Sequence, residues 1–264
     1  KYLGVAIDND FDLYIGHYYN HMGIVKLNTG RVDLAKDCFL TSFDYFQKSG
    51  DYVESARALN NIGFIFSDYL DDVDTAMKYY EEGLEISRKF HSIESELVFL
   101  NNIGEQYLRT NNYEKAKEYI ERIESISRDI EDENSQFLSQ VNLCLIYLST
   151  GKFDRCYNYF EKISRTFNEG FVENQNVFRY YYVLFNFYIT FGNYEKAIEC
   201  INYIMDSGQG ENIVKLDIRL KSILLKYWAN QSIEKTDIDE IRSLYETSNY
   251  LGERRKGLLT LAHI

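Results

Sequence analysis

The sequence predicts an all-α protein built as a solenoid of antiparallel helix pairs. Three observations lead to this prediction. The 264 residues contain no proline, the residue that breaks helix interiors. Apolar and aromatic residues recur at intervals of three and four positions, as on a helix that buries one face. A small residue returns every 40 or 41 positions, at Gly23, Gly63 and Gly104, which indicates a repeat architecture.

The repeat frame extends along the chain in several columns. The position of the three glycines continues at Cys144, Phe185 and Leu225. A second small residue follows twelve positions later, at Ala35, Ala116, Cys156 and Ala197. Ala76 follows Gly63 by thirteen, which predicts a one-residue slip in the loop 69–72. A turn is predicted seven positions after the first small residue, at Gly30, Asn111, Gly151 and Gly192. Each frame therefore reads as two helices joined by a short turn, and one such hairpin buries its apolar face only by stacking on the next.

These columns resemble the tetratricopeptide repeat family, in a long variant of 40 to 41 residues like that of kinesin light chains and bacterial peptide-sensing regulators. The resemblance is strong over five copies and weak over 213–250, where Trp228 and Ile241 keep only the helical pattern. It implies one TPR-like α-α superhelix over residues 1–264. The predicted segments are 1–10 (tail of a preceding repeat), 11–50, 51–91, 92–132, 133–172, 173–212, 213–250 and 251–264 (start of a further repeat).

Both ends of the chain fall inside a repeat in this frame. We therefore expect an internal piece of a longer solenoid, whose uncapped terminal repeats allow self-association.

Charge and composition disfavour several classes of partner and location. The formal net charge is −12, so direct binding to nucleic acid or to an acidic membrane surface is not expected. The sequence shows no signal peptide and no apolar run long enough to span a bilayer. The four cysteines form no C-x-x-C pair, and we interpret Cys144 and Cys156 as small buried thiols rather than a redox pair. A cytoplasmic protein with reduced thiols and no cofactor is the prediction.

The family architecture implies that the first helix of each pair lines a concave face. Five positions of each first helix would then point inward, and eight of these 25 positions in five repeats are Asn. An Asn amide both donates and accepts, so it can pair with the backbone of an extended peptide. The predicted ligand-binding residues are Asn20, Arg57, Asn60, Asn61, Phe64, Asn101, Asn102, Glu105, Arg109, Asn142, Arg179, Tyr182 and Asn186.

Within this set, Arg57, Arg109 or Arg179 is expected to pair with a ligand carboxylate. The alternative for the asparagines at the sixth repeat position, Asn61, Asn102 and Asn142, is that they bridge adjacent helices and contact no ligand.

Catalytic and metal sites find little support in the sequence. His17 and His21 lie one helical turn apart, but they lack the H-E-x-x-H pattern and a third ligand, so no metal is predicted. The inward positions offer mainly amides and aliphatic side chains, so we do not expect an enzyme. The predicted function is a protein- or peptide-binding scaffold, as the sensory or regulatory arm of a larger bacterial signalling protein. The alternative is a purely structural assembly module in a multiprotein complex.

Overall fold

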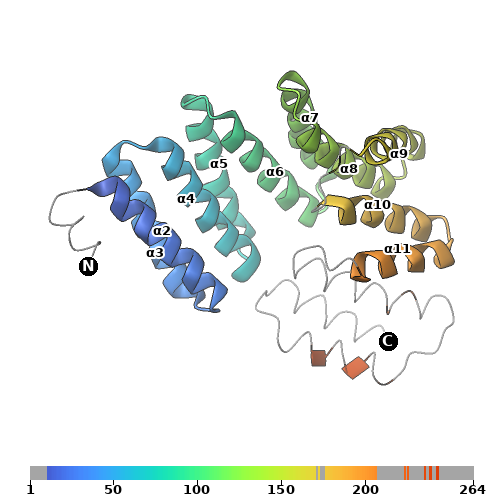
Figure 1. The fold of residues 1–264 in the computed structure, drawn as a ribbon, viewed down its shortest axis with the longest axis horizontal. Coiled ribbons are helices and arrows are strands. Elements are labelled where there is room, and N and C mark those ends of the chain that lie inside the picture. Colours follow the sequence, from blue (N-terminus) through green and yellow to red (C-terminus); the bar gives the residue numbers. More distant parts are fainter. Residues whose placement is uncertain are drawn as a thin grey trace. The chain divides into compact units, whose positions relative to one another are not determined.

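The computed structural model confirms the all-α prediction over the residues that it describes (Figure 1). The described residues are 11–170, 172, 176–206, and 223, 225, 235, 238, 239, 242 and 243. Within them the regular elements are helices packed in consecutive pairs, and no strand occurs. No helix in this part of the chain has the length and apolar character required to cross a membrane.

The predictions for the two ends of the chain, 1–10 and 251–264, fall outside the described residues, as do those for Trp228 and Ile241.

The chain divides into two compact units, residues 1–112 and 113–264. The helices of the first unit are α2 Asp12–Asn28, α3 Val32–Ser49, α4 Tyr52–Phe64, the π-helix η1 Ile65–Tyr69, α5 Val73–Lys89 and α6 Ile93–Arg109. Helix α2 packs on α3, and α4 with η1 packs on α5. Helices α3 and α5 also pack on the helices that follow them, α4 and α6, so the hairpins of this unit lie side by side (Figure 1).

The second unit contains the same kind of hairpins. Its described helices are α7 Tyr113–Asp129, α8 Glu133–Ser149, α9 Phe153–Asn168, α10 Val177–Thr190 and α11 Tyr194–Asp206. Helix α8 packs on α7 and α9, and α10 packs on α11 and also contacts α8 and α9.

The predicted turn column is confirmed by the backbone. Gly30, Asn111, Gly151 and Gly192 all have left-handed φ angles, between 57° and 73°. At Gly30 this conformation directs two amides back to the end of α2: the Gly30 N–H donates to the Leu27 carbonyl and the Arg31 N–H to the Lys26 carbonyl, both at 2.9 Å. These bonds satisfy carbonyls that the end of a helix leaves without partners, and they allow the chain to reverse within a few residues.

The small-residue columns lie where the two helices of a hairpin cross. Ala35 and Ala76 are completely buried, and so are Ala116 and Ala197. Gly23 has no Cβ and so leaves room for the ring of Phe39, since a Cβ on Gly23 would lie 2.5 Å from Phe39 Cε1. The repeat frame is therefore a packing pattern, in which a small residue on one helix accommodates a large residue on its partner.

The one-residue slip in the second repeat takes a different form from the predicted loop change. The extra residue is absorbed in the π-helical turn Ile65–Tyr69, which overlaps the predicted loop only at Tyr69, and there the Leu70 N–H donates to the Ile65 carbonyl five residues earlier. A π-helical turn accommodates one more residue than an α-helical turn, so the insertion widens the end of the first helix and leaves α5 in frame.

Burial of Cys200 in α11 predicts a loss of stability at alkaline pH. Desolvation raises the pKa of this thiol from 9.0 to about 11. The unfolded chain therefore ionises first, and the stabilisation that is complete below pH 9 is lost as the pH rises through about 11. We expect the melting temperature to fall over this interval, and to fall less in Cys200→Ala. Equal slopes for the two proteins in melting curves measured by circular dichroism would contradict this prediction.

Candidate functional site

The predicted ligand-binding residues are divided between the two units. Nine of them lie in the first unit, on the helices α2, α4 and α6, and we call the surface that they form the first-helix face. Its members are Asn20, Arg57, Asn60, Asn61, Phe64, Asn101, Asn102, Glu105 and Arg109. These three helices are the first helices of successive hairpins, so residues about 41 positions apart in the sequence are brought together on this face.

Four asparagines of the first-helix face form two hydrogen-bonded pairs between successive first helices. The Asn61 Nδ2 donates to Asn20 Oδ1 at 2.8 Å. The Asn102 Nδ2 donates to Asn60 Oδ1 at 2.5 Å. In each pair the donor occupies the same repeat position and the acceptor lies one position earlier in the preceding repeat. We call this arrangement the amide ladder, and it shows that Asn61 and Asn102 do bridge adjacent helices.

The amide ladder uses only part of the hydrogen-bonding capacity of these side chains. A primary amide has two donors and an oxygen that accepts twice, and each amide spends one group on its partner. The Asn60 NH₂ group and the Asn61 carbonyl oxygen are left over, and Asn60 and Asn61 are only partly buried. Asn101, also partly buried, makes no side-chain hydrogen bond among the described residues. The face therefore offers both donors and acceptors to a ligand, in orientations set by the ladder.

A second polar cluster surrounds Ser67, in the π-helical turn at the end of α4. Its hydroxyl accepts hydrogen bonds from Gln106 Nε2 at 2.9 Å and from Arg109 Nη1 at 2.6 Å, both on α6. The hydroxyl of Tyr80 on α5 also pairs with Ser67, and burial raises the pKa of this phenol. We call Ser67, Tyr80, Gln106 and Arg109 the Ser67 cluster. Because Ser67, Tyr80 and Gln106 are buried, its hydrogen bonds hold α6 in a defined register against the second hairpin, α4–α5.

The π-helical turn explains how Arg109 is held. Its Nη1 also donates to the Ser67 backbone carbonyl at 3.1 Å. In addition, Arg109 Nη1 lies 3.6 Å from Asp68 Oδ1, and Nη2 donates to Asp71 Oδ1 at 3.3 Å. The widened turn thus presents a carbonyl and two carboxylates to one guanidinium.

Both arginines of the first-helix face are therefore paired within the protein. Arg57 Nη1 donates to Glu54 Oε1 at 2.8 Å, one turn earlier on α4. The sequence predicted ligand carboxylates as partners for Arg57 and Arg109; in the structure a ligand carboxylate would compete with Glu54 at the first and with Asp68 and Asp71 at the second.

The sequence reasoning missed Ser67, Gln106, Glu54 and Asp71. The slip between Gly63 and Ala76 was the only signal in the sequence that pointed to this region.

Phe64 and Glu105 complete the first-helix face. Phe64 is partly buried, and its ring meets that of Tyr69 edge-on at 5.8 Å between centroids. Glu105 lies partly buried on α6. His17, which also lies on this side of α2, has its Nδ1 3.8 Å from Glu54 Oε2. Among the described residues, no three His, Cys, Asp or Glu side chains are grouped so that they could hold a metal ion.

The four predicted residues of the second unit do not repeat the amide ladder. The Asn186 amide donates to the Tyr182 carbonyl of its own helix at 2.6 Å, so this donor is used locally. Asn142 is buried on α8. Arg179 lies over the ring of Phe178 at 5.3 Å, and its buried Nε has no hydrogen-bond partner among the described residues. One pair of amides does join first helices in this unit, since Asn176 Nδ2 at the N-cap of α10 donates to Asn134 Oδ1 on α8 at 2.8 Å, but at other repeat positions than those of the amide ladder.

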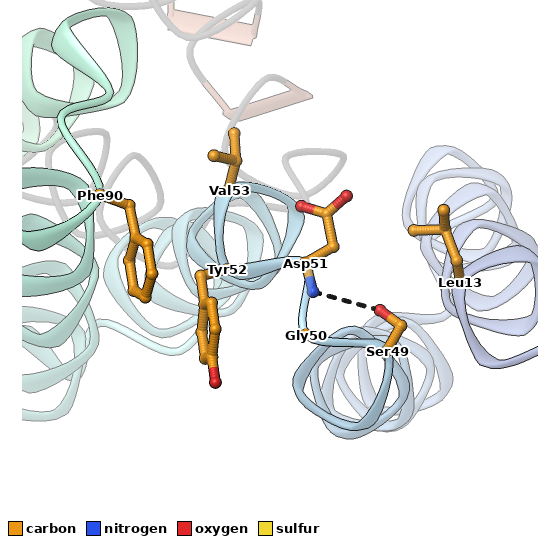
Figure 2. Close-up of a pocket in the computed structure, with 7 residues that line it drawn as sticks. All are labelled: Leu13, Ser49, Gly50, Asp51, Tyr52, Val53 and Phe90. Atoms are coloured by element: carbon orange, nitrogen blue, oxygen red, sulfur yellow. Dashed lines mark hydrogen bonds between the residues drawn. The ribbon is translucent and has the colours of Figure 1, made fainter.

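A shallow cavity of about 480 Å³ lies at the junction between α3 and α4, away from the predicted residues (Figure 2). Figure 2 shows Leu13 of α2 facing the Asp51 carboxylate, while the rings of Tyr52 and Phe90 stack at 4.3 Å on the other side. One carboxylate oxygen of Asp51 already accepts from the Glu54 N–H and caps α4. The lining is thus largely structural, and none of the predicted ligand-binding residues contributes to it.

Hairpins in register, with small residues at each crossing and polar side chains shared between first helices, define a helical-repeat scaffold. Two segments match models of the tetratricopeptide repeat, residues 14–89 and 98–130, and the chain carries tetratricopeptide-like repeats. No protein of curated function matches the chain by sequence.

Solved structures with the same fold include NprR in complex with its cognate peptide NprX, at 13% identity and a TM-score of 0.69 over 94% of this chain and 71% of NprR. A Rap protein complexed with Competence and Sporulation Factor is 16% identical, with a TM-score of 0.66 over 99% of this chain and 77% of that protein. Aspartyl phosphate phosphatase F from Bacillus subtilis is 13% identical, with a TM-score of 0.68 over 83% of this chain. This chain spans 56% of the phosphatase.

Proposed function

We propose that this chain is a binding scaffold that holds an extended peptide, or an extended segment of a partner protein, on the first-helix face of its first unit. The observation that carries the proposal is the amide ladder, which joins three successive helices through a buried amide on α2, Asn20, and partly exposed amides on α4 and α6. Two proteins of the same fold were solved with a bound factor or peptide, NprR with NprX and Rap with Competence and Sporulation Factor. We further propose that the chain serves as the sensory or regulatory arm of a larger bacterial signalling protein.

The ladder suits peptide backbone because both are built from amides. An extended peptide presents its N–H and C=O groups at intervals, and each needs a partner of the opposite kind. The Asn60 NH₂ can donate to a peptide carbonyl, and the Asn61 oxygen can accept from a peptide N–H. The fixed orientation of the ladder amides lowers the entropy that binding would cost, because their rotamers are already set.

The separation of the helices sets the length of the ligand segment. Packed helices lie about 8–10 Å apart, so α2, α4 and α6 span roughly 16–20 Å from first to third axis. An extended chain advances about 3.3 Å per residue, so about five or six residues would cover the face. Backbone pairing of this kind tolerates many sequences, and side chains near Phe64 and Glu105 would provide selectivity.

Asn101→Ala is the substitution that tests this function. Selection from a displayed library of random linear peptides on the purified chain would provide a binding peptide for fluorescence anisotropy. Because Asn101 makes no side-chain hydrogen bond within the described residues, we expect the substitution to weaken binding by about tenfold per lost hydrogen bond and to leave the melting temperature unchanged.

Asn158→Ala is the matched control, because Asn158 is exposed on α9 and outside the predicted site. It should bind the selected peptide like the wild type. If the library yields no binding peptide, or if both variants bind equally well, the peptide proposal is wrong. If the chain then captured a folded partner protein in a stable, stoichiometric complex, the alternative function, a structural assembly module, would be favoured.

A further inference from the structure

Two cysteines of the second unit occupy the small-residue columns of one hairpin. Cys144 on α8 stands at the repeat position of Gly23, and Cys156 on α9 stands at that of Ala35. These columns mark the crossing of the two helices, where side chains from both helices meet. Of the described hairpins, only α8–α9 has a thiol at both positions.

The structure brings the two thiols into direct contact. The Sγ atoms lie 3.5 Å apart, and Cys144 Sγ lies 3.5 Å from the Cys156 backbone carbonyl. Cys144 is 0% exposed and Cys156 is 1% exposed. A disulfide has an S–S length of about 2.05 Å, so each sulfur would move by less than about 1 Å, within the reach of small χ1 adjustments. The other two cysteines, Cys38 and Cys200, are free and have no contact of this kind in the described structure.

We propose that Cys144 and Cys156 form a modification site: low-molecular-weight disulfides of the glutathione class convert the pair to an intramolecular disulfide. The result would be a covalent link between α8 and α9. This proposal replaces the sequence-based interpretation of Cys144 and Cys156 as small buried thiols without a redox role.

Access to the pair comes through the first turn of α9. Cys156 lies in this turn, and its neighbours Arg155 and Tyr157 are exposed. The N-cap residue of α9, Lys152, provides no side-chain hydrogen bond, whereas the Asp132 carboxylate caps α8. An uncapped first turn opens more readily than a capped one, and opening this turn exposes the Cys156 sulfur to a small reagent without unfolding the hairpin.

The electrostatics of the pair fit Cys156 as the attacking thiol. The hydrogen bond between the two thiols lowers the pKa of Cys156, and the same bond together with burial raises the pKa of Cys144. The Cys156 thiolate attacks one sulfur of the reagent R–S–S–R, whose S–S bond breaks and releases R–S⁻. Cys144 then loses its proton, attacks the Cys156 sulfur and displaces the second R–S⁻. Two protein thiols are oxidised, one reagent disulfide is reduced to two thiols, and the two protons pass to solvent.

The experiment treats the full chain with oxidised glutathione at pH 8 and follows the intact mass. We expect the protein to lose the mass of two hydrogen atoms and to retain no glutathione. Trypsin cleaves at Lys152 and Arg155, between the two cysteines, so the linked peptides appear as one species without reductant and as two with it. The melting temperature should rise on oxidation, because the link restricts the unfolded chain.

Three variants distinguish this pair from the other thiols. Cys144→Ala should retain one glutathione on Cys156. The double variant Cys38→Ala/Cys200→Ala keeps the pair and should behave like the wild type. Cys156→Ala introduces the residue that other repeats carry at this position, so it is expected to fold, and it should show no loss of two hydrogens. An unchanged wild-type mass after prolonged incubation, a stable glutathione adduct, or a link that involves Cys38 or Cys200 would each overturn the proposal.

Discussion

Gly23→Val is expected to lower the free energy of unfolding by about 2–3 kcal/mol, as overpacking of a core does. The Cβ of any larger residue would lie 2.5 Å from Phe39 Cε1 and 2.7 Å from Cδ1, closer than real side-chain contacts allow. The ring cannot move aside easily, because Phe39 is 1% exposed and packs against Ile62 and Ile65. The substitution would therefore force α2 and α3 apart at the crossing that defines the repeat.

Ile24→Val is the control for this prediction, since Ile24 is the next residue on α2 and is 40% exposed. It introduces the same side chain on the surface, where a change of less than about 0.5 kcal/mol is typical. Urea denaturation of both variants measures the difference, and Gly23→Ala should fall between them. If Gly23→Val were as stable as Ile24→Val, the small-residue column would not be a packing requirement.

Ser67→Ala is expected to lower the free energy of unfolding by about 3 kcal/mol, because buried donors lose their acceptor. The Ser67 hydroxyl accepts from Gln106 and Arg109 and pairs with Tyr80, so its removal affects three side chains from two helices. Gln106 is 4% exposed and Tyr80 2%, so water cannot readily replace the lost partner. The loss should appear as a lower urea midpoint in circular dichroism.

Ser87→Ala provides the matched comparison for the Ser67 cluster. Ser87 is equally buried, but its hydroxyl donates only to the Gly83 carbonyl, four residues earlier in the same helix. Its loss leaves no buried donor without a partner, so we expect a cost of about 1 kcal/mol or less. Similar costs for the two serines would show that the Ser67 cluster does not hold α6 against the second hairpin.

The thirteen-residue spacing between Gly63 and Ala76 predicted part of the local structure at the end of α4. The spacing revealed that the second repeat contains one extra residue, but not where it would be accommodated. A loop and a π-helical turn both absorb one residue, and the choice depends on contacts with another repeat. Here Arg109, more than 30 residues away in the sequence, donates to the Ser67 carbonyl and is paired with Asp68 and Asp71.

The amide ladder likewise separates what the sequence showed from what contacts between repeats decided. The enrichment of Asn on the first helices was visible in the sequence, and so was the register that places Asn61 one repeat after Asn20. Whether those amides bridge helices or remain available to a ligand remained open, because one amide has enough donors and acceptors for both. The structure shows that the amides bridge the helices, and it leaves the Asn60 NH₂ group and the Asn61 carbonyl oxygen without a partner in the ladder. The peptide proposal rests on these two groups.

The sequence by itself determined the helices, their turns and the frame in which they repeat. These features arise from interactions between residues close together in the chain: the left-handed turn at Gly30, the helical spacing of apolar residues and the small residues of one hairpin. Only the tertiary structure decided the partners of Asn61, Ser67 and Arg109, because a hydrogen bond or ion pair between repeats depends on distances of a few tenths of an ångström between helices far apart in sequence. The contact between the Cys144 and Cys156 thiols was decided in the same way, by how closely two helices approach at their crossing.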